Sequence, residues 1–252
     1  MSFLSFYCRN KLYGCLLGMD AFPKPQTFIG FGRTAPVDPP GTVEEPVNDD
    51  YNRIFYTHWK IAGRDVSNDT TITAYTRTDW GTLTHFLIWD ALEGGNLLAY
   101  GVLPDPVVAP SGRVLSFSKN KLQLQIIPGT ITNYLTNRFL EHLFGIVTLA
   151  SIHSYIGLSY TNPGDAGTPV HPISADYHDV AFLGWEISDL SELVNIAAIN
   201  FIPRTDWGAL PYVYVRDAEG RTLFYSAFES PIVADQYSPV VIEPNQLTIV
   251  FD

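Results

Sequence analysis

The sequence has few cysteines, few charged residues and no long apolar run. Only two cysteines occur, Cys8 and Cys15. On a single helix their Cα atoms would lie about 10 Å apart, which is more than the roughly 7 Å that a disulfide can span. We therefore expect no disulfide between them. The two cysteines are compatible with synthesis in a reducing compartment.

Basic side chains are also scarce, with 15 Lys and Arg against 26 Asp and Glu, for a net charge of −11. A surface of this sign repels phosphate backbones and anionic lipid, so we expect neither nucleic-acid binding nor membrane association. A membrane span would need about 20 consecutive apolar residues, and the sequence has no such run. The apolar start at residues 1–7 lacks the basic beginning of a secretory signal.

The chain does have an internal repeat. Arg-Thr-Asp-Trp-Gly at 77–81 returns unchanged at 204–208, and the residues on both sides correspond as well. Each copy then runs through an acidic-Gly turn into a short apolar strand. We interpret the chain as two copies of one module, residues 1–127 and 128–252.

Each module begins with a predicted helix. Residues 3–18 carry apolar side chains at helical spacing and end at Gly18, and the second copy repeats this stripe up to Gly145. Pro128 and Gly129 predict a turn, and Thr130 is the expected N-cap of the second helix. The boundary between modules is therefore placed at 127–130.

The rest of each module predicts strands. Aromatic residues make up 13% of the chain, which also has 19 Gly and 18 Pro, a composition that favours many short strands. The matched segments are 27–31 with 154–158, 59–61 with 185–187, 68–75 with 195–202, and 122–126 with 247–251. Gly30 and Gly157 predict a close approach of a neighbouring group. The predicted fold is mainly β: two tandem, homologous modules, each an N-terminal α-helix with roughly six to eight strands in an antiparallel β-sandwich.

Two polar, proline-rich loops, 34–52 and 162–179, interrupt the modules at corresponding places. In the second loop, two imidazoles and two carboxylates could hold a divalent metal; they are His171, Asp176, His178 and Asp179. Their spacing fits no metal motif, and the first loop has no histidine. The acidic run in the first loop also lacks calcium-loop spacing; it consists of Glu44, Glu45, Asp49 and Asp50. We interpret both clusters as solvated loops and predict no metal site.

Catalytic signatures are absent as well. No Gly-x-Ser-x-Gly, phosphate loop, dinucleotide fingerprint or His-Glu-x-x-His is present. His85 becomes Tyr212 in the second copy, and Cys8 and Cys15 become Leu135 and His142. A residue that changes type between copies is more consistent with packing than with catalysis. We predict no catalytic residue, no cofactor and no enzyme activity.

The repeated Asp-Trp-Gly has a structural interpretation. Its Asp would bind nearby backbone amides, Gly would adopt the special dihedral, and Trp80 and Trp207 would fill the space beneath the turn. Asp90 and Asp217 are expected to end a strand and start a hairpin turn.

A family resemblance rests on these same features. In the second copy it is carried by Asn137, Phe139, the run 142–145, the strand 155–158, Asp206-Trp207-Gly208 and Asp217; in the first copy by 80–86, Asp90, 94–98 and Gly101. The chain resembles small tailed-bacteriophage proteins, usually called tail fibre or virion structural proteins. The tandem arrangement departs from their single modules, and the second copy departs at Pro211, Tyr212 and Arg216. The resemblance implies a particle component without enzyme activity or cofactor.

Two functional hypotheses follow. The first is a structural protein of the virion, in the tail, baseplate, collar or fibre attachment, assembled in the host cytoplasm and bound to other virion proteins. Two modules per chain suggest a homo-oligomer, in which a trimer would present six similar faces to a sixfold ring. The second is a receptor- or glycan-binding or capsid-decoration module, in which Tyr51 or Tyr177 would be exposed for stacking on sugars. A depolymerase with paired carboxylates ranks below both, because no acid pair recurs in both copies.

Overall fold

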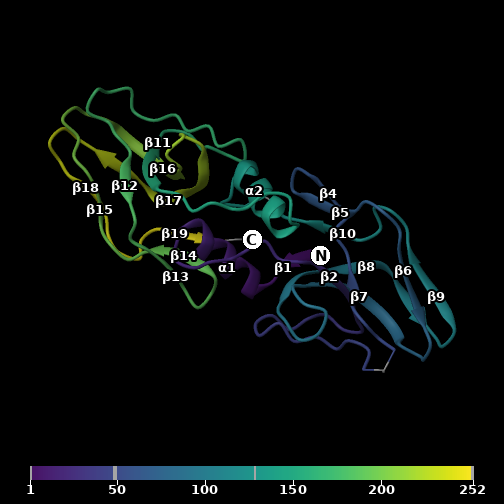
Figure 1. The fold of residues 1–252 in the computed structure, drawn as a ribbon. Coiled ribbons are helices and arrows are strands. Elements are labelled where there is room, and N and C mark those ends of the chain that lie inside the picture. The colour runs from purple at the N-terminus through teal and green to yellow at the C-terminus, as the bar shows by residue number, and fades with distance from the viewer. Residues whose placement is uncertain (1, 48–49, 128, 251–252) are drawn as a thin grey trace. The chain divides into compact units, whose positions relative to one another are not determined.

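The two helices begin at hydroxyl side chains. In this computed structural model, described over residues 2–47, 50–127 and 129–250, helix α1 spans Phe6–Leu16 and helix α2 spans Asn133–Leu143 (Figure 1). Ser5 Oγ accepts the Cys8 N–H at 3.1 Å, and Thr132 Oγ1 accepts the Leu135 N–H at 3.4 Å. These are N-cap hydrogen bonds. The predicted N-cap at Thr130 is therefore wrong, and the Thr130 hydroxyl donates to Val250 O instead.

Both helices end as the sequence predicts. Gly18 and Gly145 have φ of 70° and 78°, the left-handed conformation that favours glycine. The next N–H folds back onto the helix, from Met19 to Gly14 O at 2.8 Å and from Ile146 to Glu141 O at 2.7 Å. The predicted start of the first helix at residue 3 is wrong, because Ser2–Leu4 forms strand β1.

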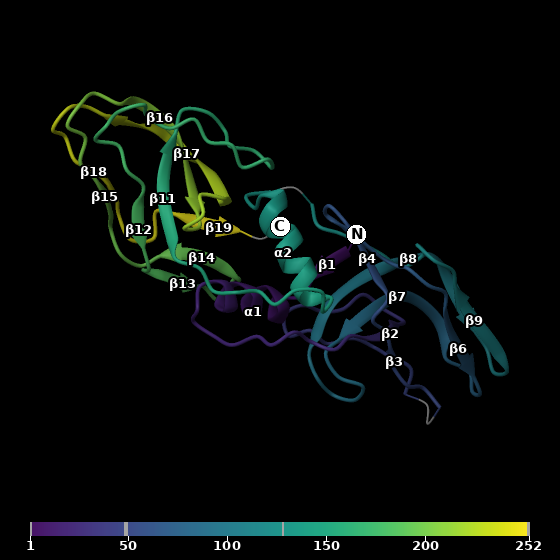
Figure 2. The same ribbon diagram turned by 45° about the horizontal axis from the view of Figure 1, so that its top comes forward.

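The first repeat contains three antiparallel sheets, formed by β1 and nine further strands of the described residues (Figures 1 and 2). These are β2 (Phe28–Gly32), β3 (Ile54–Phe55), β4 (Trp59–Ala62), β5 (Asp65–Asn68), β6 (Ile72–Thr76), β7 (Gly81–Trp89), β8 (Leu97–Ala109), β9 (Arg113–Phe117) and β10 (Gln123–Gln125). The strand orders are β1-β8-β7-β2-β3, β10-β5-β4 and β6-β9.

The second repeat reproduces this plan in its described residues. Its strands are β11 (Ser154–Ser159), β12 (Val180–Phe182), β13 (Trp185–Ile187), β14 (Glu192–Asn195), β15 (Ile199–Phe201), β16 (Gly208–Arg216), β17 (Thr222–Ala234), β18 (Val240–Ile242) and β19 (Thr248–Val250). The sheets are ordered β12-β11-β16-β17, β13-β14-β19 and β15-β18. A single bridge between Ile131 and Phe224 takes the place of β1. The predicted class, mainly β with one helix in each of two homologous modules, is confirmed; the expected strand number was too low.

The longest strand of each repeat carries an unpaired insertion. Along β7 and β8, Leu83 pairs with Val107 and His85 with Val102, so residues 103–106 lie outside the ladder. Leu210 and Tyr212 produce the same break opposite 228–231 of β17. Three prolines lie in these insertions: Pro104, Pro106 and Pro231. Proline has no N–H for a ladder hydrogen bond, so these positions accept it.

Buried side-chain hydrogen bonds occur at corresponding positions in the two repeats. The indole N–H of Trp59 donates to Thr27 Oγ1 at 3.0 Å, and that of Trp185 donates to Ser154 Oγ at 2.9 Å. Asn68 is fully buried, and its Oδ1 accepts the Leu122 N–H at 2.9 Å. These buried polar groups are satisfied, as a stable core requires.

By contacts, the chain forms two compact units that do not coincide with the repeats. Unit 1 comprises residues 1–12, 22–126 and 139–148, and unit 2 comprises 13–21, 127–138 and 149–252. Neither helix in the described part of the chain is long and apolar enough to cross a membrane.

Candidate functional site

The repeated Asp-Trp-Gly forms the turn that leads into β7 and β16. Asp79 Oδ1 accepts the Gly81 N–H at 2.8 Å, and Asp206 Oδ1 accepts the Gly208 N–H at 3.1 Å. Both glycines have positive φ, 79° and 71°. This confirms the predicted roles of Asp and Gly.

The tryptophans fix the turn to the end of the neighbouring strand. Trp80 and Trp207 are 2% and 4% exposed. Their backbone N–H groups donate to Ala109 O and Ala234 O, the last residues of β8 and β17, at 2.9 and 2.8 Å. The prediction that both tryptophans are structural is confirmed by this burial.

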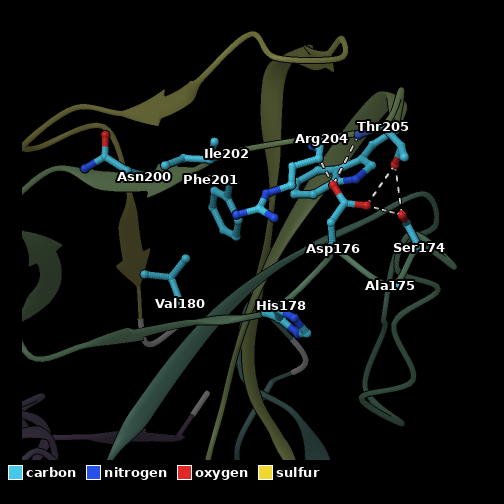
Figure 3. A pocket seen from close by; sticks show the side chains of 11 residues that line it. Ser174, Ala175, Asp176, His178, Val180, Asn200, Phe201, Ile202, Arg204 and Thr205 are labelled. Carbon is cyan, nitrogen blue, oxygen red and sulfur yellow. Dashed lines mark hydrogen bonds between the residues drawn. The ribbon is translucent and has the colours of Figure 1, made fainter.

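A carboxylate from the proline-rich loop binds the Arg-Thr backbone that precedes each Asp-Trp-Gly. Asp176 Oδ2 accepts the Arg204 N–H at 2.5 Å and the Thr205 N–H at 3.2 Å (Figure 3). Its Oδ1 accepts the Thr205 hydroxyl at 2.9 Å and also the Ser174 hydroxyl. The hydrogen bond from Ser174, followed by those from Arg204 and Thr205, holds the pKa of Asp176 well below its usual value.

Asp50 does the same in the first repeat. It accepts the backbone N–H groups of Arg77 at 2.6 Å and Thr78 at 3.1 Å, and also the Thr78 hydroxyl. The hydroxyl of Thr78 is the main reason why the pKa of Asp50 is lowered. Arg-Thr therefore recurs because its backbone and hydroxyl are bound by the loop. Sequence reasoning missed this contact, although aspartates stand at matched places in the two loops.

An open pocket of about 680 Å³ lies beside the Asp176 contact. His178 and Val180 line it from the loop side, and Asn200, Phe201 and Ile202 from β15 and the residue after it (Figure 3). The Asp176 oxygens are directed at Arg204 and Thr205 (Figure 3). The carboxylate is thus already used within the protein.

The first loop has another bound carboxylate, Glu45, which pairs with an arginine. Glu45 Oε2 lies 2.6 Å from Arg53 Nη2, and the two side chains are 15% and 10% exposed. The guanidinium also lies 3.7 Å from the Trp89 ring centre and donates to Gly94 O at 2.6 Å. Tyr51 donates its hydroxyl to Glu45 at 2.6 Å and accepts the Phe31 N–H at 2.7 Å. The cluster fixes the loop to β2 and β7.

The second repeat builds the same kind of cluster from different residues. Asp179, whose side chain is 5% exposed, pairs with Arg216 Nε and accepts the Tyr214 hydroxyl at 2.8 Å. Tyr177 donates to Leu158 O at 3.1 Å and accepts the Leu158 N–H at 2.6 Å. A pocket of about 730 Å³ lies beside this cluster, lined in part by Tyr155 and Arg216.

Glycine makes room for both clusters. A Cβ on Gly30 would lie 2.3 Å from Glu45 Oε1, and one on Gly157 would lie 2.3 Å from Tyr214 Cζ and 2.4 Å from Asp179 Oδ1. Real Cβ atoms do not approach this closely, so the predicted close approach at these glycines is confirmed.

Several sequence-based expectations are corrected here. The two acidic loops are not simply solvated, because Glu45, Asp50, Asp176 and Asp179 are bound to the protein itself. For Asp50, Asp176 and Asp179 the expectation failed because the groups that bind them lie 27 or more residues further along the chain, whereas Arg53, which binds Glu45, follows it by eight residues. Glu44 is exposed, and Asp49 lies outside the described residues.

The four residues considered as metal ligands bind or contact different groups of the protein. His171 stacks on Tyr177 with ring centres 5.4 Å apart, whereas Asp176 and Asp179 bind different groups. Over residues 2–47, 50–127 and 129–250, no three His, Cys, Asp or Glu side chains are grouped so that they could hold a metal. The tyrosines expected to stack on sugars are not exposed: Tyr177 is 7% exposed, and Tyr51 is half-buried.

The remaining candidate residues have structural surroundings. Cys8 and Cys15 are free and buried on α1, and burial raises the pKa of the Cys8 thiol. His85 Nδ1 lies 2.7 Å from Thr84 Oγ1. As predicted, Asp90 and Asp217 support the hairpin turns, accepting the N–H of Asn96 at 2.6 Å and of Arg221 at 2.9 Å.

Comparisons with known proteins place the repeat in a family. No curated protein matches the chain. The family described as "Podophage GP4 fiber I protein gp80" matches residues 4–125 and matches again over residues 130–250. With nearly its whole length matched in two consecutive copies, the chain belongs to this family of phage fibre proteins and carries the family's module twice.

Proposed function

We propose that this protein is a non-enzymatic structural component of the phage tail, at the baseplate, the collar or a fibre attachment, acting through protein–protein interfaces. The observation that carries the proposal is the use of the loop carboxylates. In both repeats they bind backbone amides and arginines of the same repeat, as Asp50 and Glu45 do in the first and Asp176 and Asp179 in the second. Side chains used in this way rigidify a scaffold.

The partners that fit this proposal are other virion proteins, together with further copies of the chain. We propose that residues 1–127 and 128–252 each offer a similar outer surface, so that a trimer would match a sixfold ring. Light scattering on the purified protein, alone and mixed with the other tail proteins, measures this directly. A monomer or a dimer under both conditions would contradict the trimer.

Receptor or glycan binding, or capsid decoration, is the second candidate function. It is favoured by two open pockets that lie beside the loop at 162–179, about 680 and 730 Å³ in volume. Tyr155 and His178 line these pockets and are not fully buried. Binding of the isolated protein to host surface glycans, abolished by Tyr155→Ala and retained in Tyr134→Ala, would favour this function over the first.

Immunogold labelling of purified particles distinguishes the candidates. Label at the tail, collar or baseplate would support the structural proposal. Label spread over the head would favour decoration. The absence of label on intact particles, with the protein present in infected lysate, would contradict both the structural and the decoration proposals. A depolymerase activity would then become the hypothesis to test.

A further inference from the structure

The compact units and the repeats divide the chain differently. Unit 1, built mainly from the first repeat, also contains residues 139–148 of the second repeat. Unit 2, built mainly from the second repeat, contains residues 13–21 of the first. The two segments are the same part of the module: the C-terminal part of its helix, with the residues that follow.

Within unit 1, residues 139–148 contribute buried side chains. Phe144 is 6% exposed and lies 5.0 Å from Trp59, measured between ring centres. His142 is fully buried, and its ring lies 5.3 Å from that of Phe22. Lys24 Nζ donates to Gly145 O at 3.2 Å. The residues contacted belong to the first repeat; they are Trp59, Phe22 and Lys24. The core of unit 1 is therefore incomplete without residues 139–148 of the second repeat.

Within unit 2, residues 13–21 contribute in the same way. Tyr13 is fully buried, with its ring 6.0 Å from that of Phe224. Leu16 O accepts the Ile152 N–H at 2.8 Å, and a Cβ on Gly14 would lie 3.8 Å from Ile187 Cδ1. The core of this unit therefore includes side chains from the first repeat.

We propose that the two repeats exchange these helix ends, so that each repeat completes the hydrophobic core of the other and a single repeat has no complete core of its own. The surface around Trp59 and Phe22 is then an acceptor site whose occupant is the helix end of another repeat. A chain with one repeat would have an open acceptor and a free helix end, and would pair with a second copy by swapping them.

The test uses the full chain with a protease site inserted between Ile127 and Gly129, cut after folding. The expected result is that the two halves elute together from gel filtration at the size of the uncut chain, and separate only in denaturant. Elution of the halves as two separate species without denaturant would overturn the proposal. The uncut protein with the insertion serves as the control for folding.

A matched pair of substitutions in residues 139–148 shows whether the helix end itself holds the halves together. Phe144→Ala removes a buried ring against Trp59 and should weaken association of the cut halves at least 100-fold. Ile146→Ala, two residues later and 56% exposed, should change it less than about threefold. Equal effects of the two substitutions would overturn the exchange, because association would then not depend on the buried side chain.

Discussion

At the scale of the residue, the loop aspartates act as hydrogen-bond acceptors for backbone N–H groups. A carboxylate has two oxygens and about four sites for accepting hydrogen bonds, and Asp176 uses both oxygens on the turn at Arg204 and Thr205. Hydrogen bonds to an ionised acceptor are stronger than those to a neutral one. Fixing the turn therefore depends on the ionised form of Asp176.

This dependence gives a pH prediction for Asp176→Asn. Because the pKa of Asp176 is lowered in the folded protein, its contribution to stability is fully present above the unfolded pKa, near 4, and is lost as the pH falls through the lower folded value. The variant should melt below the wild type at pH 7, and the difference should shrink as the pH falls below about 4. Melting temperatures followed by circular dichroism between pH 2 and 8 measure this.

The control is Asp189→Asn, which removes the same charge from an exposed carboxylate of the same repeat. It should leave the melting temperature nearly unchanged at every pH. A difference for Asp176→Asn that is constant with pH would contradict the role of the ionised carboxylate.

Neighbouring glutamates provide the next prediction. Glu45 pairs with Arg53 in a largely buried site, whereas Glu44 is 57% exposed and lies 3.5 Å from Arg33. Glu45→Gln should lower the free energy of unfolding by about 2–3 kcal/mol, because it leaves the Arg53 guanidinium without its charged partner. Glu44→Gln should cost less than about 1 kcal/mol. Urea unfolding of the two variants measures both, and equal losses would show that the Glu45 pair is not special.

At the scale of the element, strand β11 can lie close to the cluster of Asp179, Tyr214 and Arg216 because it carries a glycine at position 157. Gly157→Ala would place a methyl group 2.3 Å from Tyr214 Cζ. Since buried aromatic and charged groups cannot all move away, we expect a loss of about 3 kcal/mol in the free energy of unfolding. Gly164→Ala is the control: its φ is 61°, and no atom would lie within 4 Å of the added Cβ, so it should cost about 1 kcal/mol. Urea unfolding compares them, and a smaller loss at Gly157 would contradict the close packing.

The sequence predicted those elements whose signals are local. The glycines at the helix ends and the Asp-to-Gly hydrogen bonds of the repeated turn depend on neighbouring residues alone. The start of α1 was predicted too early because apolar residues 3 and 4 continue the helical stripe, whereas tertiary pairing with β8 makes them part of a strand. Prolines 104 and 106 concealed the full length of β8, since the insertion that accepts them is visible only in the register with β7.

At the scale of the whole molecule, the repeat and the family could be recognised because corresponding residues lie in the same order in both copies. The candidate site could be recognised only in part. Asp-Trp-Gly is contiguous, whereas Asp50 and Asp176 lie well before the Arg-Thr pairs that they bind, in loops whose polar composition suggested solvation. The composition of the two units was also not evident, because a helix with the right apolar spacing does not indicate which repeat it will pack against.

The exchange of helix ends makes a prediction about cooperativity. If each unit contains core residues from both repeats, neither repeat can unfold and leave the other intact. Calorimetry of the full chain should then show one unfolding transition. Phe144→Ala should reduce the free energy of unfolding by about 3–5 kcal/mol. It should therefore lower the temperature of that single transition by roughly 10 °C. Two transitions, of which Phe144→Ala moves only one, would mean that each repeat is stable by itself and that Phe144 adds only local packing to unit 1. Tyr13→Ala, the corresponding change in unit 2, should shift the same single transition, because it removes a fully buried ring next to Phe224.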